Sequence, residues 1–244
     1  CYSVNECENE KLVKCMGMYI DANGYPIQSF KNGANNVQIL LDEEGYRSSV
    51  EFFDAWGNRD KDKNYAYAYK WELGDDGRYT KKSVVDETGT SVYDKKSESS
   101  TKFEYKEGKL VKKINVDVHG NICVNKLGFA QQLFEYDEKG RMISESFYNE
   151  KGKPVSIKNK YGVVCHAIWY RYDKNGCVSL VGYYDENKKL MPTGCAYTEI
   201  NNNELGKVER TLNYKSNQDL HIVNGVAGEE KKYEDKINAT LVTS

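Results

Sequence analysis

The segment YAYAYKWELGDDG, residues 65–77, combines an alternating strand pattern with a turn signal. From residue 65 to residue 73 the odd positions hold aromatic rings and a leucine, whereas the even positions hold alanine, lysine and glutamate. Successive side chains of a strand point to opposite faces, so this pattern predicts a half-buried β-strand. The GDDG that follows predicts a hairpin turn, because Asp accepts hydrogen bonds from nearby main-chain N–H groups and Gly tolerates positive φ.

Similar turn signals recur along the whole chain at a nearly constant interval. One series reads YIDANG (19–24), FFDAWG (52–57), VVDETG (84–89), NVDVHG (115–120), FYNEKG (147–152), YYDENK (183–188) and NYKSNQ (213–218). A second series lies between its members and reads LLDEEG (40–45), ELGDDG (72–77), EYKEG (104–108), EYDEKG (135–140), RYDKNG (171–176), NNNELG (201–206) and KYEDK (232–236). The third residues of the first series are 33, 32, 31, 32, 36 and 30 positions apart. We therefore predict about seven repeats, each with two turns.

The strand before each second turn carries large side chains at matched positions. Trp71 and Leu73 correspond to Phe103 with Tyr105, and to Phe134 with Tyr136. A single hairpin cannot bury its own face, so we expect the repeats to pack on one another, with Trp71 and Leu73 in the core. No helical stripe is sustained over three turns. The predicted fold is all-β, made of repetitive antiparallel β-hairpins in a meandering or spiral sheet or an elongated stack.

The two ends of the chain depart from the repeat. Residues 1–16 lack a first-turn signal and are predicted to form an N-terminal cap or tether. Residues 17–214 are the predicted repeat domain. Residues 215–244 are predicted to be a degenerate capping repeat, because Glu229 and Lys231 stand where earlier repeats are mostly apolar, and an outermost repeat has solvent on one side.

The composition limits the kinds of partner that the protein can bind. The chain has 244 residues and a net charge of -2, with 35 basic and 37 acidic residues interspersed, so it lacks the basic patch that binds nucleic acid. No run of 18 apolar residues predicts a membrane-spanning helix. The chain has 20 tyrosines but only 7 phenylalanines, which favours shallow sheets whose rings are covered on one side and whose hydroxyls reach water.

Part of the aromatic row has no counterpart in other repeats. The positions of Tyr67 and Tyr69 hold Ser99 and Thr101 in one repeat, and Ala130 and Gln132 in another. Packing between repeats therefore does not require rings there. The candidate ligand-binding residues are Tyr65, Tyr67, Tyr69 and Trp56, and the competing interpretation is that they only cover the sheet.

The first residue, Cys1, raises the question of a lipid anchor. A bacterial lipoprotein is cut before a cysteine that is then acylated, so Cys1 is a candidate lipidation site, although the usual flexible Ser/Gly tether is absent. The seven cysteines form no CxxC pair of a zinc or redox site. A disulfide between Cys7 and Cys15 is one alternative, and buried free thiols are the other.

The motifs FYNEKGKPV, KYG, YRYDKNG and YYDENKKL resemble the tyrosine-aspartate (YD) class of bacterial β-hairpin repeat. This class occurs in RHS-type shells and in many surface or secreted proteins. The resemblance extends over roughly residues 16–236, but Asn149, Lys106 and Lys215 replace its aspartate. It implies a β-meander with an extracytoplasmic scaffold or binding role, and it carries over no catalytic residue.

No motif for catalysis, metal or cofactor binding stands out. His119 lies in a turn and His221 in the degenerate repeat. Cys165 and His166 are neighbours that point to opposite faces of a strand, which disfavours a nucleophile pair. We therefore expect a non-enzymatic, secreted or cell-surface repeat protein that binds a protein or a glycan. The alternatives are a shell or stalk segment of a larger RHS-like assembly and, less favoured, a polysaccharide-active enzyme.

Overall fold

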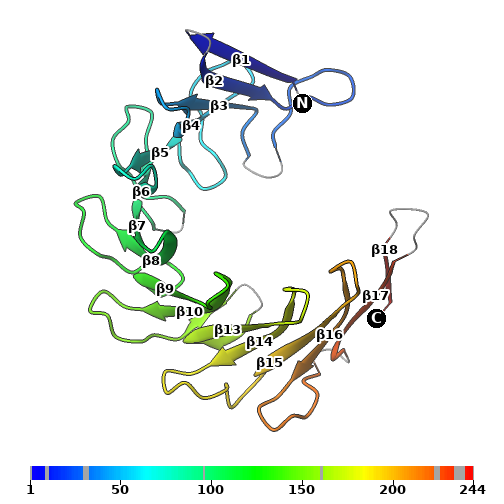
Figure 1. Ribbon diagram of the computed structural model, residues 1–244. Coiled ribbons are helices and arrows are strands. Elements are labelled where there is room, and N and C mark those ends of the chain that lie inside the picture. Colours follow the sequence, from blue (N-terminus) through cyan, green and yellow to red (C-terminus); the bar gives the residue numbers. More distant parts are fainter. Residues whose placement is uncertain are drawn as a thin grey trace. The chain divides into compact units, whose positions relative to one another are not determined.

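The computed structural model describes residues 2–8, 11–29, 33–95, 97–159, 162–222, 226–233 and 240–243. Regular secondary structure in these ranges consists of β-strands alone (Figure 1). The prediction of an all-β fold of meandering antiparallel hairpins is thus confirmed. Within the same ranges, no helix is long and apolar enough to cross a membrane. Cys1 lies outside them, so its predicted lipidation stays a prediction.

The chain forms two compact units. The N-terminal unit comprises residues 1–106 and 113–126, and the C-terminal unit comprises residues 107–112 and 127–244. The strands of the first are β1 (Tyr2–Glu8), β2 (Lys11–Met18), β3 (Asn36–Leu41), β4 (Arg47–Phe53), β5 (Ala68–Leu73), β6 (Tyr79–Val85), β7 (Ser100–Lys106) and the end of β8 (Lys109–Val116). The strands of the second are β9 (Gln131–Tyr136), β10 (Met142–Tyr148), β11 (Ile157–Lys158), β12 (Val164–Cys165), β13 (Ala167–Tyr172), β14 (Val178–Tyr184), β15 (Tyr197–Asn202), β16 (Val208–Tyr214), β17 (Gly228–Tyr233) and β18 (Thr240–Thr243).

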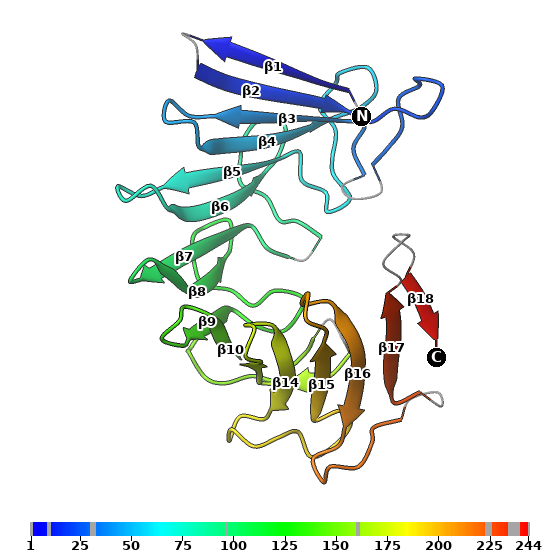
Figure 2. The same cartoon turned by 45° about the vertical axis from the view of Figure 1, so that its right-hand side comes forward.

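Strand order follows chain order within each unit (Figure 2). Hairpin pairs such as β3–β4 and β5–β6 each form within a single repeat, whereas pairs such as β4–β5 join one repeat to the next. The segment predicted as an N-terminal cap contributes β1 and most of β2, which pair with each other, and β2 also pairs with β3. Only the short pair β11–β12 forms a separate sheet.

Many of the predicted turns are held by the side chain of an Asp or Asn at their third position. In the first-turn series, Oδ1 of Asp54 accepts hydrogen bonds from the N–H groups of Trp56 (2.9 Å) and Asn58 (2.8 Å). In the second series, Oδ1 of Asp137 accepts in the same way from the N–H groups of Lys139 and Arg141. These bonds tie the main chain two and four residues after the Asp to its carboxylate, so hydrogen bonds between residues close in sequence hold the turns.

Several repeats contain a third turn that the sequence analysis did not predict. In the repeat that includes β5, Oδ1 of Asp62 accepts from the N–H groups of Asn64 (2.8 Å) and Ala66 (3.0 Å). Oδ1 of Asn159 accepts from the N–H of Val163 in the same manner. The signal is an Asp or Asn followed by Lys, as in DKNY (62–65), DKKS (94–97), NKLG (125–128) and NKYG (159–162).

The buried core lies near the strand ends that lead into the first turns. Phe52 (3% exposed), Val84 (4%) and Phe147 (4%) occupy matched positions there in three repeats. Trp71 and Leu73 are half-buried and do not belong to this core, so the prediction that they are core residues is wrong. They lie at the end of β5 that leads into the second turn.

The tyrosines before the second turns connect neighbouring repeats. Each hydroxyl donates a hydrogen bond to a main-chain carbonyl oxygen of the preceding repeat, in the pairs Tyr105 to Tyr79 (3.0 Å), Tyr136 to Leu110 (2.8 Å) and Tyr172 to Met142 (2.6 Å). A cation lies near each ring, in the pairs Arg78 with Tyr105 (5.9 Å), Lys109 with Tyr136 (5.7 Å) and Arg141 with Tyr172 (4.5 Å). These rings need a polar end, which explains why tyrosine is preferred to phenylalanine here.

Candidate functional site

The predicted aromatic residues of the N-terminal unit occupy different kinds of position. Trp56 lies in a first turn and is 86% exposed. Tyr65 lies in the third turn, outside β5, and is 58% exposed. Tyr67 precedes β5 and is half-buried, whereas Tyr69 lies within the strand. The expected continuous row from residue 65 to residue 73 is therefore interrupted, because the strand begins only at Ala68.

Tyr69 is fastened to the structure. Its hydroxyl donates a hydrogen bond of 2.9 Å to Oδ2 of Asp62, and its ring packs edge-on against Phe52, with centroids 5.8 Å apart. Nζ of Lys82 lies 3.8 Å from the ring centroid. Burial and the nearby Asp62 carboxylate raise the pKa of Tyr69, so the phenol stays protonated and keeps donating. Tyr69 therefore supports the third turn.

Tyr65 and Tyr67 are less constrained by their neighbours. Nζ of Lys61 lies 5.1 Å from the centroid of the Tyr67 ring, and Nζ of Lys95 lies 5.7 Å from that of Tyr65. Tyr65 has φ of 67°, in the left-handed region that favours glycine. The matching third-turn position is Gly128 or Gly162 in later repeats. The turn would be less strained with glycine at this position.

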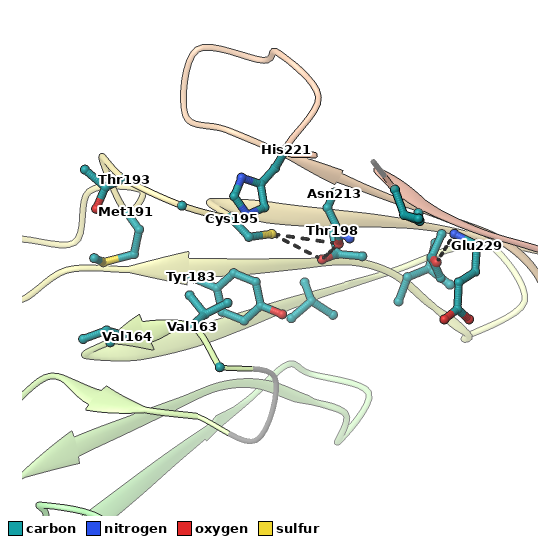
Figure 3. A pocket seen from close by; sticks show the side chains of 17 residues that line it. Val163, Val164, Tyr183, Met191, Thr193, Cys195, Thr198, Asn213, His221 and Glu229 are labelled. Carbon is teal, nitrogen blue, oxygen red and sulfur yellow. Dashed lines mark hydrogen bonds between the residues drawn. The ribbon is translucent and has the colours of Figure 1, made fainter. Parts of the chain in front are cut away.

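A cavity of about 910 Å³ in the C-terminal unit was missed in the sequence analysis. Its walls include Tyr183, Cys195, Thr198, Asn213 and His221, which come from the last described repeats (Figure 3). Thr198 donates a hydrogen bond of 2.8 Å from its hydroxyl to Oδ1 of Asn213. The available signal was the appearance of polar residues at positions that hold Phe147 and Tyr183, and Val155 and Met191, in the two preceding repeats.

Cys195 and His221 both line this cavity, which invites comparison with a thiol nucleophile and its base. The Cys195 thiol donates to the carbonyl oxygen of Tyr197 (3.4 Å), and burial raises its pKa. A nucleophilic cysteine needs the opposite shift, towards the thiolate. The arrangement therefore suits binding better than catalysis.

The other cysteines are explained by packing where they are described. Cys165 is fully buried, and burial raises its pKa to about 11. The side chain of Cys7 lies outside the described residues, so its pairing with Cys15 stays a prediction. Among the described residues, no group of three or more His, Cys, Asp or Glu side chains is placed to hold a metal ion.

Comparison with known proteins shows a distant likeness. No family model and no curated protein matches the chain. A crystal structure of TcdB2-TccC3-TEV is 10% identical over 98% of this chain and 12% of that chain, with a TM-score of 0.46. TcdB2-TccC3 without its hypervariable C-terminal region is 10% identical over 96% and 12%, with a TM-score of 0.43. A Photorhabdus luminescens Tc holotoxin pore is 10% identical over 98% and 14%, with a TM-score of 0.34. The chain thus spans 12 to 14% of the length of these proteins, and the likeness assigns it no function.

Proposed function

We propose that the chain is a non-enzymatic, secreted or cell-surface repeat protein whose N-terminal unit binds a macromolecule, a protein or a glycan. The observation that carries the proposal is the placement of Trp56. The matching first-turn position in other repeats holds Asn23, Thr88, His119, Lys151, Asn187 and Asn217. The turn itself therefore has no need for an indole ring.

The surroundings of Trp56 favour binding. Asp54 holds the turn through two main-chain hydrogen bonds, so the exposed ring is presented from a constrained backbone. Large aromatic residues dominate the energetics of many interfaces, and a constrained backbone reduces the entropy lost on association. A tryptophan that is this exposed, and whose ring has no hydrogen-bond or ring contact among the described residues, is therefore a good candidate anchor.

Tyr65 is a second residue that its turn does not require, because other repeats have glycine at the same position. A tyrosine in the left-handed region costs free energy that glycine would avoid, and most of its ring faces solvent. Tyr67, with Lys61 near its ring, adds a partly exposed aromatic surface at the start of the next strand. Aromatic surfaces of this kind stack on sugar rings or pack against apolar protein side chains.

The experiment uses turn-compatible substitutions. Trp56→Asn introduces the residue found in three other first turns, and Tyr65→Gly introduces the residue found in other third turns. Binding of the purified chain would be measured on a glycan array and by affinity capture of extracellular proteins. We expect each variant to lose at least about tenfold in affinity, which corresponds to about 1.4 kcal/mol of binding free energy, with its melting temperature kept or raised.

A matched control is His119→Asn, which changes the same turn position in another repeat. It should leave binding unchanged. Ligands that bind wild type and both aromatic variants with equal affinity would contradict the proposal.

A shell or stalk segment is the second candidate function. It is favoured by the repeated tyrosine-to-carbonyl bonds, such as that between Tyr136 and Leu110, which suit a load-sharing scaffold. A scaffold role predicts that Trp56→Asn leaves the assembly intact, whereas substitutions of these tyrosines weaken it. Hydrolysis by paired carboxylates finds no support in the cavity, where Glu229 is the only carboxylate of the lining.

A further inference from the structure

The cavity in the C-terminal unit lies where the repeating core changes its chemistry. Main-chain hydrogen bonds define equivalent positions, since the N–H of Val155 donates to Phe147, that of Met191 to Tyr183 and that of His221 to Asn213. In three consecutive repeats, one equivalent strand position is therefore occupied by Phe147, Tyr183 and Asn213. The equivalent position in the segment that covers this strand is occupied by Val155, Met191 and His221. Both positions become polar in the same repeat.

A third position changes in parallel. The N–H groups of Ala130, His166 and Ala196 bond to equivalent carbonyls, so the residues before them, Phe129, Cys165 and Cys195, are equivalent as well. Two repeats upstream of the cavity, the rings of Phe129 and Phe147 pack with centroids 5.2 Å apart. At the cavity these two rings are replaced by the thiol of Cys195 and the amide of Asn213. Space that rings fill upstream is open here.

The polar groups in the cavity form a partly satisfied set. Oδ1 of Asn213 accepts from the Thr198 hydroxyl, but no described residue accepts a hydrogen bond from its Nδ2. The imidazole of His221 likewise has no hydrogen-bond partner among the residues that the structure describes, and Figure 3 shows its ring on the same side as Cys195. A ligand with an oxygen acceptor could satisfy both groups.

The rest of the lining is mostly apolar. Tyr183, Val181, Met191 and Ile200 provide ring and aliphatic surface. Among the described residues of the lining, Glu229 is the only acidic one, and none is a lysine or an arginine. The volume of about 910 Å³ is within the range of small-molecule sites.

We propose that this cavity binds a small uncharged aromatic molecule that carries a hydroxyl group. The ring occupies the space that Phe129 and Phe147 fill upstream, and the hydroxyl oxygen accepts from Asn213 Nδ2 or the His221 ring. This site does not involve the aromatic residues of the N-terminal unit, so the proposal can be tested independently of the proposed function.

The test uses p-cresol as the probe and toluene, its analogue without the hydroxyl. Binding is followed by chemical-shift changes of the main-chain amides of Thr198, Asn213 and His221 in a titration of the full chain. We expect p-cresol to bind with a dissociation constant on the order of 1 mM and toluene at least about threefold more weakly, as small ligands with one polar contact do. The absence of shifts at about 20 mM p-cresol, or equal binding of toluene, would overturn the proposal.

Two variants locate the site. Asn213→Phe restores the upstream residue and fills the cavity, so binding should be lost while the melting temperature is kept or raised. If that variant fails to fold, Thr198→Val gives the second readout. It frees Oδ1 of Asn213 and disorders the amide, so p-cresol should bind at least about threefold more weakly while toluene is unaffected.

Thr101→Val is the matched control. Thr101 holds the equivalent strand position in the N-terminal unit, so its substitution should leave p-cresol binding unchanged. Undiminished p-cresol binding by folded Asn213→Phe and Thr198→Val variants would place the ligand elsewhere and contradict the assignment.

Discussion

The hydroxyl of Tyr172 donates a hydrogen bond of 2.6 Å to the main-chain carbonyl oxygen of Met142, one repeat earlier in the chain. The guanidinium of Arg141 lies 4.5 Å from the centroid of the same ring. Equivalent contacts recur at Tyr105 and Tyr136. A residue that reads as a simple core ring in the sequence thus has a directional role, because its polar end bonds to the neighbouring repeat.

Tyr172→Phe tests this contact. It removes the hydrogen bond and keeps the ring, so we expect a loss of about 1 kcal/mol in the free energy of unfolding, measured by urea denaturation. Tyr184→Phe is the control, because the Tyr184 hydroxyl has no hydrogen-bond partner among the described residues. A Tyr172→Phe variant as stable as wild type would show that the bond contributes nothing.

Wild type and the Tyr172→Phe variant should also differ in how their stability changes at alkaline pH. Burial raises the pKa of Tyr172 above its ordinary value of about 10. The hydroxyl therefore stabilises the fold fully below pH 10, and this contribution is lost as pH rises through the folded-state pKa. The stability difference between wild type and Tyr172→Phe should narrow in urea titrations above pH 10, and a constant difference would contradict the assignment.

The acidic turns predict a loss of stability in acid. Oδ1 of Asp185 accepts from the N–H groups of Asn187 (2.9 Å) and Lys189 (2.8 Å), and these bonds lower its pKa. A lowered folded-state pKa means that the contribution is present above pH 4 and is lost as pH falls through the folded-state value. Asp185→Asn keeps the acceptor, as Asn149 does in its own turn. The free energy of unfolding of Asp185→Asn, measured in urea titrations, should therefore fall less than that of wild type as the pH is lowered below 4. An equal fall in both proteins would contradict this explanation.

Phe147→Ala and Trp71→Ala distinguish the observed core from the expected one. Phe147 is 4% exposed and packs against Phe129, so its truncation should lower the free energy of unfolding by about 3–5 kcal/mol. Trp71 is half-buried beneath Arg47, whose guanidinium lies 3.9 Å from the ring centroid, so its truncation should cost roughly 1–2 kcal/mol. Thermal or urea unfolding of both variants provides the comparison, and equal losses would refute it.

Tyr69 and Tyr65 should respond in opposite directions. Tyr69→Phe removes the hydrogen bond to the buried Asp62 carboxylate and should cost about 1–3 kcal/mol. Tyr65→Gly relieves the left-handed backbone and should raise stability by up to about 1 kcal/mol, whereas Tyr65→Ala, which keeps the strain, should not. Melting temperatures of the three variants decide this, and a stabilised Tyr65→Ala would argue against strain.

Local patterns predicted much of the architecture. The alternation around Trp71 placed β5, and the Asp at the start of each turn accepts the expected main-chain bonds, as at Asp54. The third turn was missed because Asp62 and Asn159 follow a lysine and not the apolar or aromatic residue that directly precedes most of the other turns, although each is itself followed by lysine. The candidate aromatic residues were placed only in part, since Tyr65 is in a turn and Tyr69 is tied to Asp62.

Local chemistry can be read from the amino-acid order: the class of fold, the spacing of the repeats and the turns follow from it, because each turn depends on hydrogen bonds within five residues. The depth of burial and the open space depend on how distant segments pack. Alternation indicates which face of a strand is covered, but not how far along the strand its neighbours extend. Trp71 is therefore half-buried while Phe147 is core, and the cavity beside Asn213 lies where two positions, distant in sequence, lose the rings that they carry upstream.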